Sequence, residues 1–123
     1  MGIHLACEDA GIAHRIVGFD IKPQKHFPFE FVQQDALTVD LTPFDAVWAS
    51  PPCQFYSRLR YLPWWRDRVY WRSIPPTREW LQASGKPYII ENVEDARWDM
   101  NTPAILCGQA LGLNLYRHRA FET

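Results

Sequence analysis

The sequence lacks any apolar run near the roughly 20 residues that a membrane-spanning helix needs. Its N-terminus also lacks the basic segment and apolar stretch that mark a signal peptide. Cysteine is scarce, with only Cys7, Cys53 and Cys107, an odd number at wide spacing. This favours a reduced, cytoplasmic protein over a disulfide scaffold. Because the cysteines and the four histidines are scattered, the sequence also predicts no zinc site, no other metal and no membrane partner.

Aromatic residues and arginines are what the chain has in excess. Its 123 residues include six Trp, seven Phe and five Tyr, while the hydrophobic (47%) and charged (22%) fractions are typical of a globular protein with one core. The net charge of −1 is uneven, since residues 58–78 hold six arginines and one acid. Aromatic residues alternate with these arginines, a mixture that suits phosphate contacts and base stacking. A solvated loop whose aromatic side chains cap the core explains the same composition equally well.

Apolar periodicity and turn residues predict a chain of alternating helices and short strands. Helices are expected over residues 2–10 and 77–84, with Thr77 as an N-cap and with Gly11 and Gly85 ending them. Strands are expected over 15–20, 29–34, 46–50, 87–93 and 104–107, with a last one around Ala120 and Phe121. Residues 63–76, rich in Trp and Arg between prolines, are expected to be irregular. This alternation predicts an α/β fold with a mostly parallel sheet covered on both faces.

Several predicted strands end in a polar or reactive residue. Asp20 and Asp35 follow two of them, and Glu91-Asn92 ends another. The run 46–50 reads as a buried strand, and Pro51 and Pro52 then forbid helix or ladder pairing, so Cys53 is presented on a stiff loop. Because ligands bind at the carboxyl ends of parallel strands, we expect one crevice to collect these side chains.

Three motifs in this order resemble the cytosine-5 DNA methyltransferase family, most of all its short phage and prophage forms. They are Ser50-Pro51-Pro52-Cys53-Gln54 after a strand, Glu91-Asn92-Val93 about forty residues later, and Arg117-His118-Arg119. The likeness extends over nearly the whole chain. It implies a Rossmann-like sheet that binds S-adenosylmethionine, with residues 1–123 forming a single partial catalytic domain and no separate target-recognition domain. The family's first strand and its Phe-x-Gly-x-Gly loop are missing, so we expect an N-terminally truncated domain with weakened cofactor binding.

The resemblance assigns catalytic roles that fit the chemistry. Carbon 5 of cytosine is too weak a nucleophile to take a methyl group unaided, and a thiolate adding to carbon 6 activates it. Cys53 is the implied nucleophile, and Glu91 the carboxyl group that shares a proton with N3. Asn92 is expected to hold the loop by hydrogen bonds, and Arg119, with Arg117, to bind the base O2. Alternatively, Glu91 merely caps a strand or pairs with an arginine, and the two arginines form an ordinary basic edge.

The resemblance also implies the cofactor and nucleic-acid contacts. S-adenosylmethionine, leaving as S-adenosylhomocysteine, is expected to meet Asp20, Ile21, Asp35, Ala36 and Pro52. Double-stranded DNA is the expected partner, with the target cytosine flipped out of the helix. Its contacts are expected from a mobile loop that includes Gln54, Ser57, Arg58, Arg60, Arg66 and Arg68. Two alternatives remain: a catalytically inactive remnant that still binds nucleic acid, and a tRNA cytosine-5 methyltransferase.

Overall fold

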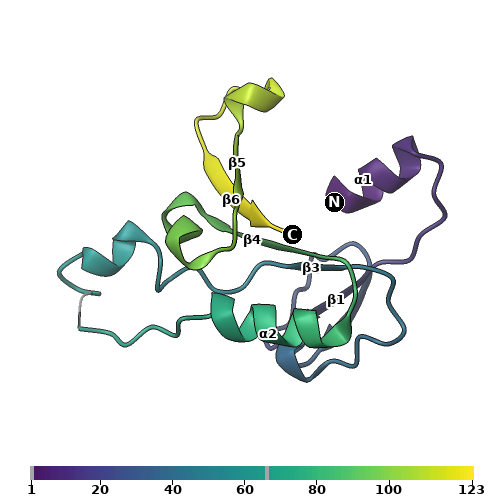
Figure 1. The fold of residues 1–123 in the computed structure, drawn as a ribbon, viewed down its shortest axis with the longest axis horizontal. Helices are drawn as coiled ribbons and strands as arrows, with labels where there is room; N and C mark the ends of the chain where they lie inside the picture. The colour runs from purple at the N-terminus through teal and green to yellow at the C-terminus, as the bar shows by residue number, and fades with distance from the viewer. Residues whose placement is uncertain (1, 66) are drawn as a thin grey trace. The chain divides into compact units, whose positions relative to one another are not determined.

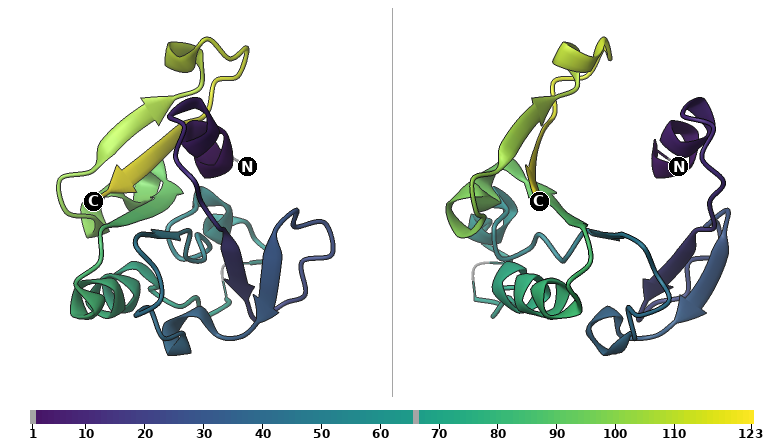
Figure 2. Two further views of the ribbon diagram at one scale, coloured as in Figure 1. Left: turned by 90° about the vertical axis from the view of Figure 1, so that its right-hand side faces the viewer. Right: turned by 45° about the vertical axis from the view of Figure 1, so that its right-hand side comes forward.

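The computed structural model describes residues 2–65 and 67–123, which form two compact units, Met1–Asp40 and Leu41–Thr123. Figures 1 and 2 show their ribbons. The first unit contains helix α1 (Gly2–Asp9) and the parallel strands β1 (Val17–Asp20) and β2 (Glu30–Gln33), followed by the 3-10 turn η1 (Ala36–Thr38). Gly11 ends α1 in a left-handed conformation (φ 67°), as predicted from its position. The Phe27 ring packs edge-on against those of Phe29 and Phe31.

The second unit is built on a four-stranded sheet in the order β3-β4-β6-β5. Its strands are β3 (Val47–Ala49), β4 (Tyr88–Val93), β5 (Ala104–Cys107) and β6 (His118–Glu122). The 3-10 turns η2 (Arg58–Tyr61), η3 (Glu94–Asp99) and η4 (Gln109–Leu111) lie in the connections. β3 and β4 are parallel, whereas β6 is antiparallel to both β4 and β5.

The prediction of one mostly parallel, Rossmann-like sheet is wrong. The described residues form two sheets, of two and four strands, and two of the four strand pairings are antiparallel. The reversal comes from the β5–β6 hairpin, in which Gly108 N donates to Arg117 O at 3.0 Å. A Cβ on Gly108 would lie 2.5 Å from the Leu115 carbonyl oxygen, so glycine permits this close turn. Hairpin strands are antiparallel, and β6 therefore enters the sheet reversed.

Helix α2 (Ile74–Ser84) supplies much of the core of the second unit. Its side chains Ile74 and Leu81 are fully buried, as are Ile90 of β4 and Ala120 of β6. The helix starts three residues before the predicted Thr77, because Ser73 is its N-cap and prolines occupy its first turn, where no N–H is required. Gly85 ends it at φ 66°, as predicted. β3 is less buried than predicted, since the Trp48 side chain is 44% exposed.

Candidate active site

The loop that carries Cys53 leaves β3 and is tied to two other elements. The Pro51 carbonyl accepts a hydrogen bond from Asn92 Nδ2 at 3.0 Å, and the Pro52 carbonyl accepts one from Ser73 Oγ at 2.8 Å. Ser73 occupies the N-cap position of α2, and Asn92 lies in β4. The two prolines also limit the backbone torsions. Cys53 is exposed at the end of this restrained loop, so its thiol is accessible to a substrate.

Asn92 joins this loop to the sheet from a buried position. Its side chain is 2% exposed, and its Oδ1 accepts a hydrogen bond from Val93 N at 2.9 Å. The amide nitrogen of Asn92 donates to the Pro51 carbonyl and the amide oxygen accepts from Val93 N, so both ends of the side chain have hydrogen-bond partners. Buried amides need such partners, and here they define the orientation of the loop relative to β4.

Glu91 of β4 and Arg119 of β6 form an ion pair on the face of the sheet opposite to Asn92, because successive side chains of a strand alternate between the two faces. Arg119 Nε lies 2.6 Å from Glu91 Oε1, and the two side chains are 27% and 21% exposed. The strand register explains the contact, because Val93 pairs with Arg119 and Glu91 pairs with Phe121, which makes Glu91 and Arg119 diagonal neighbours. The pair is thus partly open to solvent. Arg117 precedes β6 and is exposed.

A buried network behind the Cys53 loop was not predicted from the sequence. The Cys53 carbonyl accepts hydrogen bonds from the amides of Tyr56 and Ser57 at 3.0 and 2.9 Å. Tyr56 Oη in turn donates to Asp99 Oδ2 at 2.7 Å and accepts from Ile74 N at 3.1 Å. Arg72 donates hydrogen bonds to the same carboxylate from two nitrogens, Nε and Nη2. Tyr56 and Asp99 are 43 residues apart, and no local pattern signals such a pairing.

This network shifts the pKa of both buried partners. Burial and the hydrogen bond to Asp99 raise the pKa of Tyr56 to about 12. Burial works to raise the pKa of Asp99 as well, but the hydrogen bonds from Arg72 and Tyr56 outweigh it, and the pKa lies below its usual value. Tyr56 therefore stays protonated, and Asp99 ionised, over the neutral range. Together they fix the residues that follow Cys53.

We expect the Tyr56 phenol to make the fold sensitive to alkali. A pKa raised from 10.0 to about 12 on folding contributes stability that is complete below pH 10 and lost as the pH rises through 12, about 2–3 kcal/mol. Tyr56→Phe should therefore flatten the fall in unfolding free energy between pH 10 and 12. Urea titrations across this range measure it, with Tyr61→Phe, at a 68% exposed position, as the control. Equal slopes in wild type and Tyr56→Phe would contradict the prediction.

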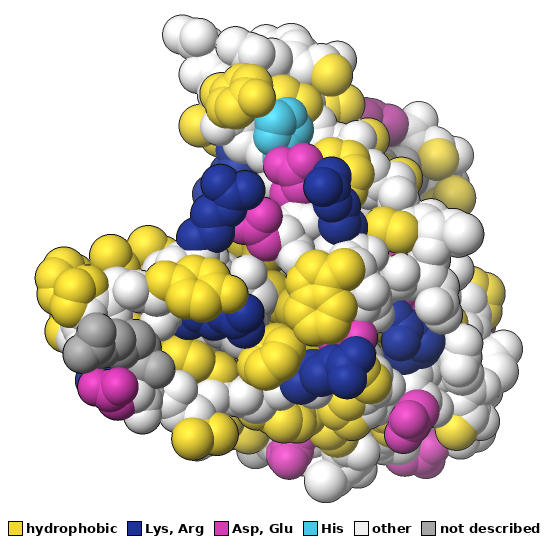
Figure 3. All heavy atoms as spheres, turned by 60° about the vertical axis from the view of Figure 1, so that its left-hand side comes forward, with side chains coloured by type: hydrophobic (Ala, Val, Ile, Leu, Met, Phe, Trp, Pro, Cys, Tyr) yellow, Lys and Arg dark blue, Asp and Glu magenta, His cyan; other side chains and the backbone are white. Residues whose placement is uncertain are grey.

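The residues predicted to contact nucleic acid differ in their exposure and in their hydrogen-bond and ion-pair partners. Gln54 is exposed, and Ser57 caps η2 by accepting from Leu59 N at 3.3 Å. Arg58 makes a two-pronged ion pair with Asp95 at 2.9 and 3.1 Å. Arg60 and Arg68 border a cavity described below, and Arg66 lies outside the described residues. Figure 3 shows a face of the molecule on which basic and hydrophobic side chains adjoin one another.

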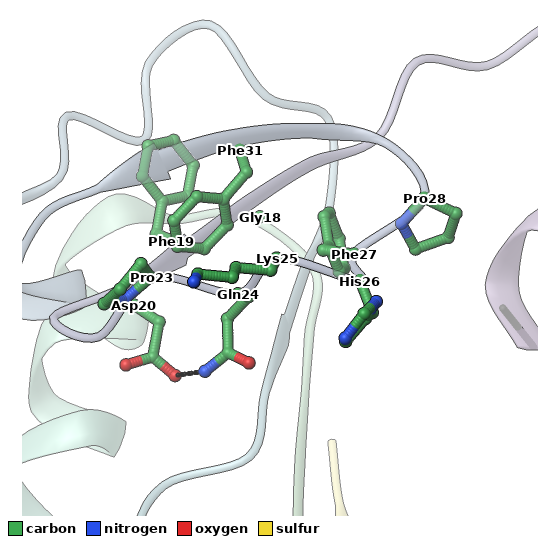
Figure 4. Close-up of a pocket in the computed structure, with 10 residues that line it drawn as sticks. All are labelled: Gly18, Phe19, Asp20, Pro23, Gln24, Lys25, His26, Phe27, Pro28 and Phe31. Atoms are coloured by element: carbon green, nitrogen blue, oxygen red, sulfur yellow. Dashed lines mark hydrogen bonds between the residues drawn. The ribbon is translucent and has the colours of Figure 1, made fainter.

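Four of the residues predicted to bind the cofactor belong to the first unit. Asp20 ends β1, and its carboxylate accepts from Lys22 N at 2.8 Å and Gln24 Nε2 at 3.0 Å. It borders a pocket of about 650 Å³, within the usual size of small-molecule sites. Figure 4 shows the rings of Phe19 and Phe31 across from Asp20 and Gln24. Ile21 is 63% exposed next to this pocket.

The other predicted cofactor residues have simpler surroundings. Asp35 caps η1 by accepting a hydrogen bond from Leu37 N at 3.0 Å, and Ala36 is the first residue of that turn. Pro52, in the second unit, is exposed beside Cys53. The side chains of residues 2–65 and 67–123 include no group of three or more His, Cys, Asp or Glu placed to hold a metal ion.

Comparisons with protein-family models, with curated proteins and with solved structures each found no match to this chain. Within the part of the chain that the structure describes, no helix combines the length and apolar character needed to cross a bilayer.

Proposed function

We propose that this chain is a cytosine-5 methyltransferase acting on double-stranded DNA, with Cys53 as the nucleophile and S-adenosylmethionine as the methyl donor. One observation carries the proposal: the exposed Cys53 lies on a loop held by Asn92, whose neighbour in β4 is the acid of the Glu91–Arg119 pair. A nucleophile, a carboxyl group and a guanidinium are the groups that this reaction requires.

The residues would act in sequence on a cytosine extruded from the duplex. The Cys53 thiolate adds to carbon 6 of the ring, and carbon 5 becomes nucleophilic. Glu91 holds a proton at N3, while Arg119 stabilises negative charge that develops near O2. Once carbon 5 carries the methyl group that the cofactor would supply, its proton passes to a solvent base, and expulsion of the Cys53 thiolate completes the cycle. Asn92 positions the loop throughout, because its amide fixes the Pro51 carbonyl.

The pocket beside Asp20 supports the choice of cofactor. Bound S-adenosylmethionine supplies an electrophilic methyl group. Phe19 and Phe31 border the pocket together with Asp20, so aromatic surface for a purine ring lies close to a carboxylate that can accept hydrogen bonds from ribose hydroxyls. Both Asp20 oxygens already accept one hydrogen bond, and each retains a further acceptor site. The chemistry of this pocket therefore fits the adenosine part of the cofactor.

Methyl transfer from labelled S-adenosylmethionine tests the proposal. We expect label in duplex DNA and much less in tRNA, and a covalent adduct with DNA containing 5-fluorocytosine, because fluorine blocks the final elimination. Cys53→Ser should abolish both signals, whereas Cys107→Ser, at a partly buried strand position, should retain them. An adduct that persists in Cys53→Ser excludes Cys53 as the nucleophile. Label that appears only in tRNA would favour the RNA-modifying alternative.

A further inference from the structure

A second cavity lies next to the Cys53 loop, in the segment between β3 and α2. Its volume is about 340 Å³, at the lower end of the range for small-molecule sites and sufficient for one nucleotide. Figure 1 shows this segment extending away from the four-stranded sheet. The described residues that line it are aromatic residues, arginines and a valine: Phe55, Tyr61, Tyr70, Arg60, Arg68 and Val69. Phe55 is only two residues beyond Cys53.

Ion pairing divides the five described arginines of residues 58–78 into two groups, and Arg66 lies outside the described residues. Arg58, Arg72 and Arg78 each face a carboxylate, namely Asp95, Asp99 and Glu122. Arg60 and Arg68, in contrast, have no carboxylate partner within residues 2–65 and 67–123. Among the arginines of this segment that the structure describes, the positive charge that remains available to a ligand therefore lies at the cavity, on Arg60 and Arg68.

Arg60 is held between two rings of the cavity wall. Its guanidinium carbon lies 5.2 Å from the Phe55 ring centre and 4.7 Å from that of Tyr61, within the range of cation–π contacts. Its nitrogens donate to the Phe55 carbonyl and the Tyr61 hydroxyl. Both acceptors are neutral groups, so these contacts do not balance the positive charge of Arg60. Tyr61 is 68% exposed, which leaves ring surface available for stacking.

The charge at the cavity distinguishes between possible occupants. An apolar peptide would bury Tyr61 and Val69 but would also desolvate two arginines without a counter-charge, which is costly. A nucleotide brings a planar base for the rings and a phosphate for the arginines. Base–aromatic stacking combined with basic contacts to the backbone is how proteins bind single strands.

We propose that this cavity binds one unpaired nucleotide of single-stranded DNA, with the base against Tyr61 and the phosphate at Arg60 and Arg68. The cavity is distinct from the position of the target cytosine at Cys53. That the single strand comes from a duplex opened by base flipping rests on the proposed function. That the cavity binds single-stranded DNA does not. The cavity would therefore hold a neighbour of the target base in an opened duplex.

Fluorescence anisotropy with a labelled twelve-residue oligothymidylate tests this at low salt. Tyr61→Leu should weaken binding about 5- to 150-fold, the range for losing one stacked base. Arg68→Gln should lower the slope of log affinity against log salt by about 0.7, as for one lost phosphate contact. Arg58→Gln should have a smaller effect, because Asp95 already neutralises that charge. Tyr116→Leu and Arg97→Gln are the matched controls at exposed positions outside the segment.

Two outcomes overturn the proposal. One is the absence of oligothymidylate binding, or equal losses in the control and cavity variants. The other is at least tenfold tighter binding of oligouridylate, which would assign the site to RNA. Cys53→Ser separates this proposal from the proposed function, since it should bind the oligonucleotide like wild type. Binding without methyl transfer in the wild type would refute the enzyme and leave the nucleotide site standing.

Discussion

Replacing Glu122 by glutamine is expected to lower the free energy of unfolding by about 3–5 kcal/mol, the cost of leaving one buried charge without its partner. The Glu122 side chain is fully buried, and Arg78 Nε lies 2.5 Å from its Oε1 with 14% of the arginine side chain exposed. The second carboxylate oxygen accepts from Arg78 Nη2 and from Asn101 N, both at 2.7 Å. The hydrogen bond to Glu122 raises the pKa of Arg78. Arg78 also stays charged after the substitution, because a guanidinium is not deprotonated in proteins.

Urea denaturation followed by tryptophan fluorescence measures this effect. Asp95→Asn is the control, because it breaks an ion pair whose side chains are 86% and 38% exposed and should cost less than about 1 kcal/mol. The double variant Arg78→Met/Glu122→Leu should recover much of the loss, since it removes both charges. A Glu122→Gln midpoint that matches that of Asp95→Asn would show that the buried pair does not stabilise the fold.

Replacing Glu91 by glutamine is expected to lower the rate of methyl transfer by about 10²- to 10⁴-fold, the usual contribution of a positioned acid or base. Glutamine keeps the shape of the side chain and a carbonyl oxygen that can accept from Arg119 Nε, which now lies 2.6 Å from Glu91 Oε1. It cannot share a proton with N3 of the base. The fold should therefore be retained while the chemistry is lost.

The rate of covalent adduct formation with 5-fluorocytosine DNA reports on this step directly. The matched control is Glu94→Gln, three residues along the chain, where the carboxylate contacts Arg97 at 3.7 Å and His118 at 3.2 Å. The control should form the adduct at the wild-type rate. If both variants lose the same fraction of activity, Glu91 has no special role and the alternative of a merely structural ion pair is correct.

Local patterns accounted for most of the secondary structure. β1, β2, β4 and β5 lie within or very close to the ranges that apolar runs predicted, and the left-handed Gly11 and Gly85 lie directly after the predicted helices. The predicted start of α2 at Thr77 is wrong, because Pro75 and Pro76 resemble helix breakers although the first turn of a helix accepts proline. Such signals act over a few residues, and this is why they can be read from the chain.

Strand pairing and charge pairing were decided by contacts between distant residues. The hairpin at Gly108 reversed β6, and the two parallel strands β1 and β2 formed a sheet of their own. Likewise the sequence shows six arginines in residues 58–78 as one basic segment, whereas folding neutralises Arg58, Arg72 and Arg78 with acids 27 or more residues away.

The amino-acid order alone determined the short strands, the stiff Pro-Pro-Cys loop and the excess of arginine beside aromatic residues, because each depends on near neighbours in the chain. Only the tertiary structure decided which strands pair, that Asn92 and Ser73 hold the Cys53 loop, and which arginines remain available to a ligand. These depend on side chains brought together across 21 to 44 residues, where no periodic pattern exists to reveal them.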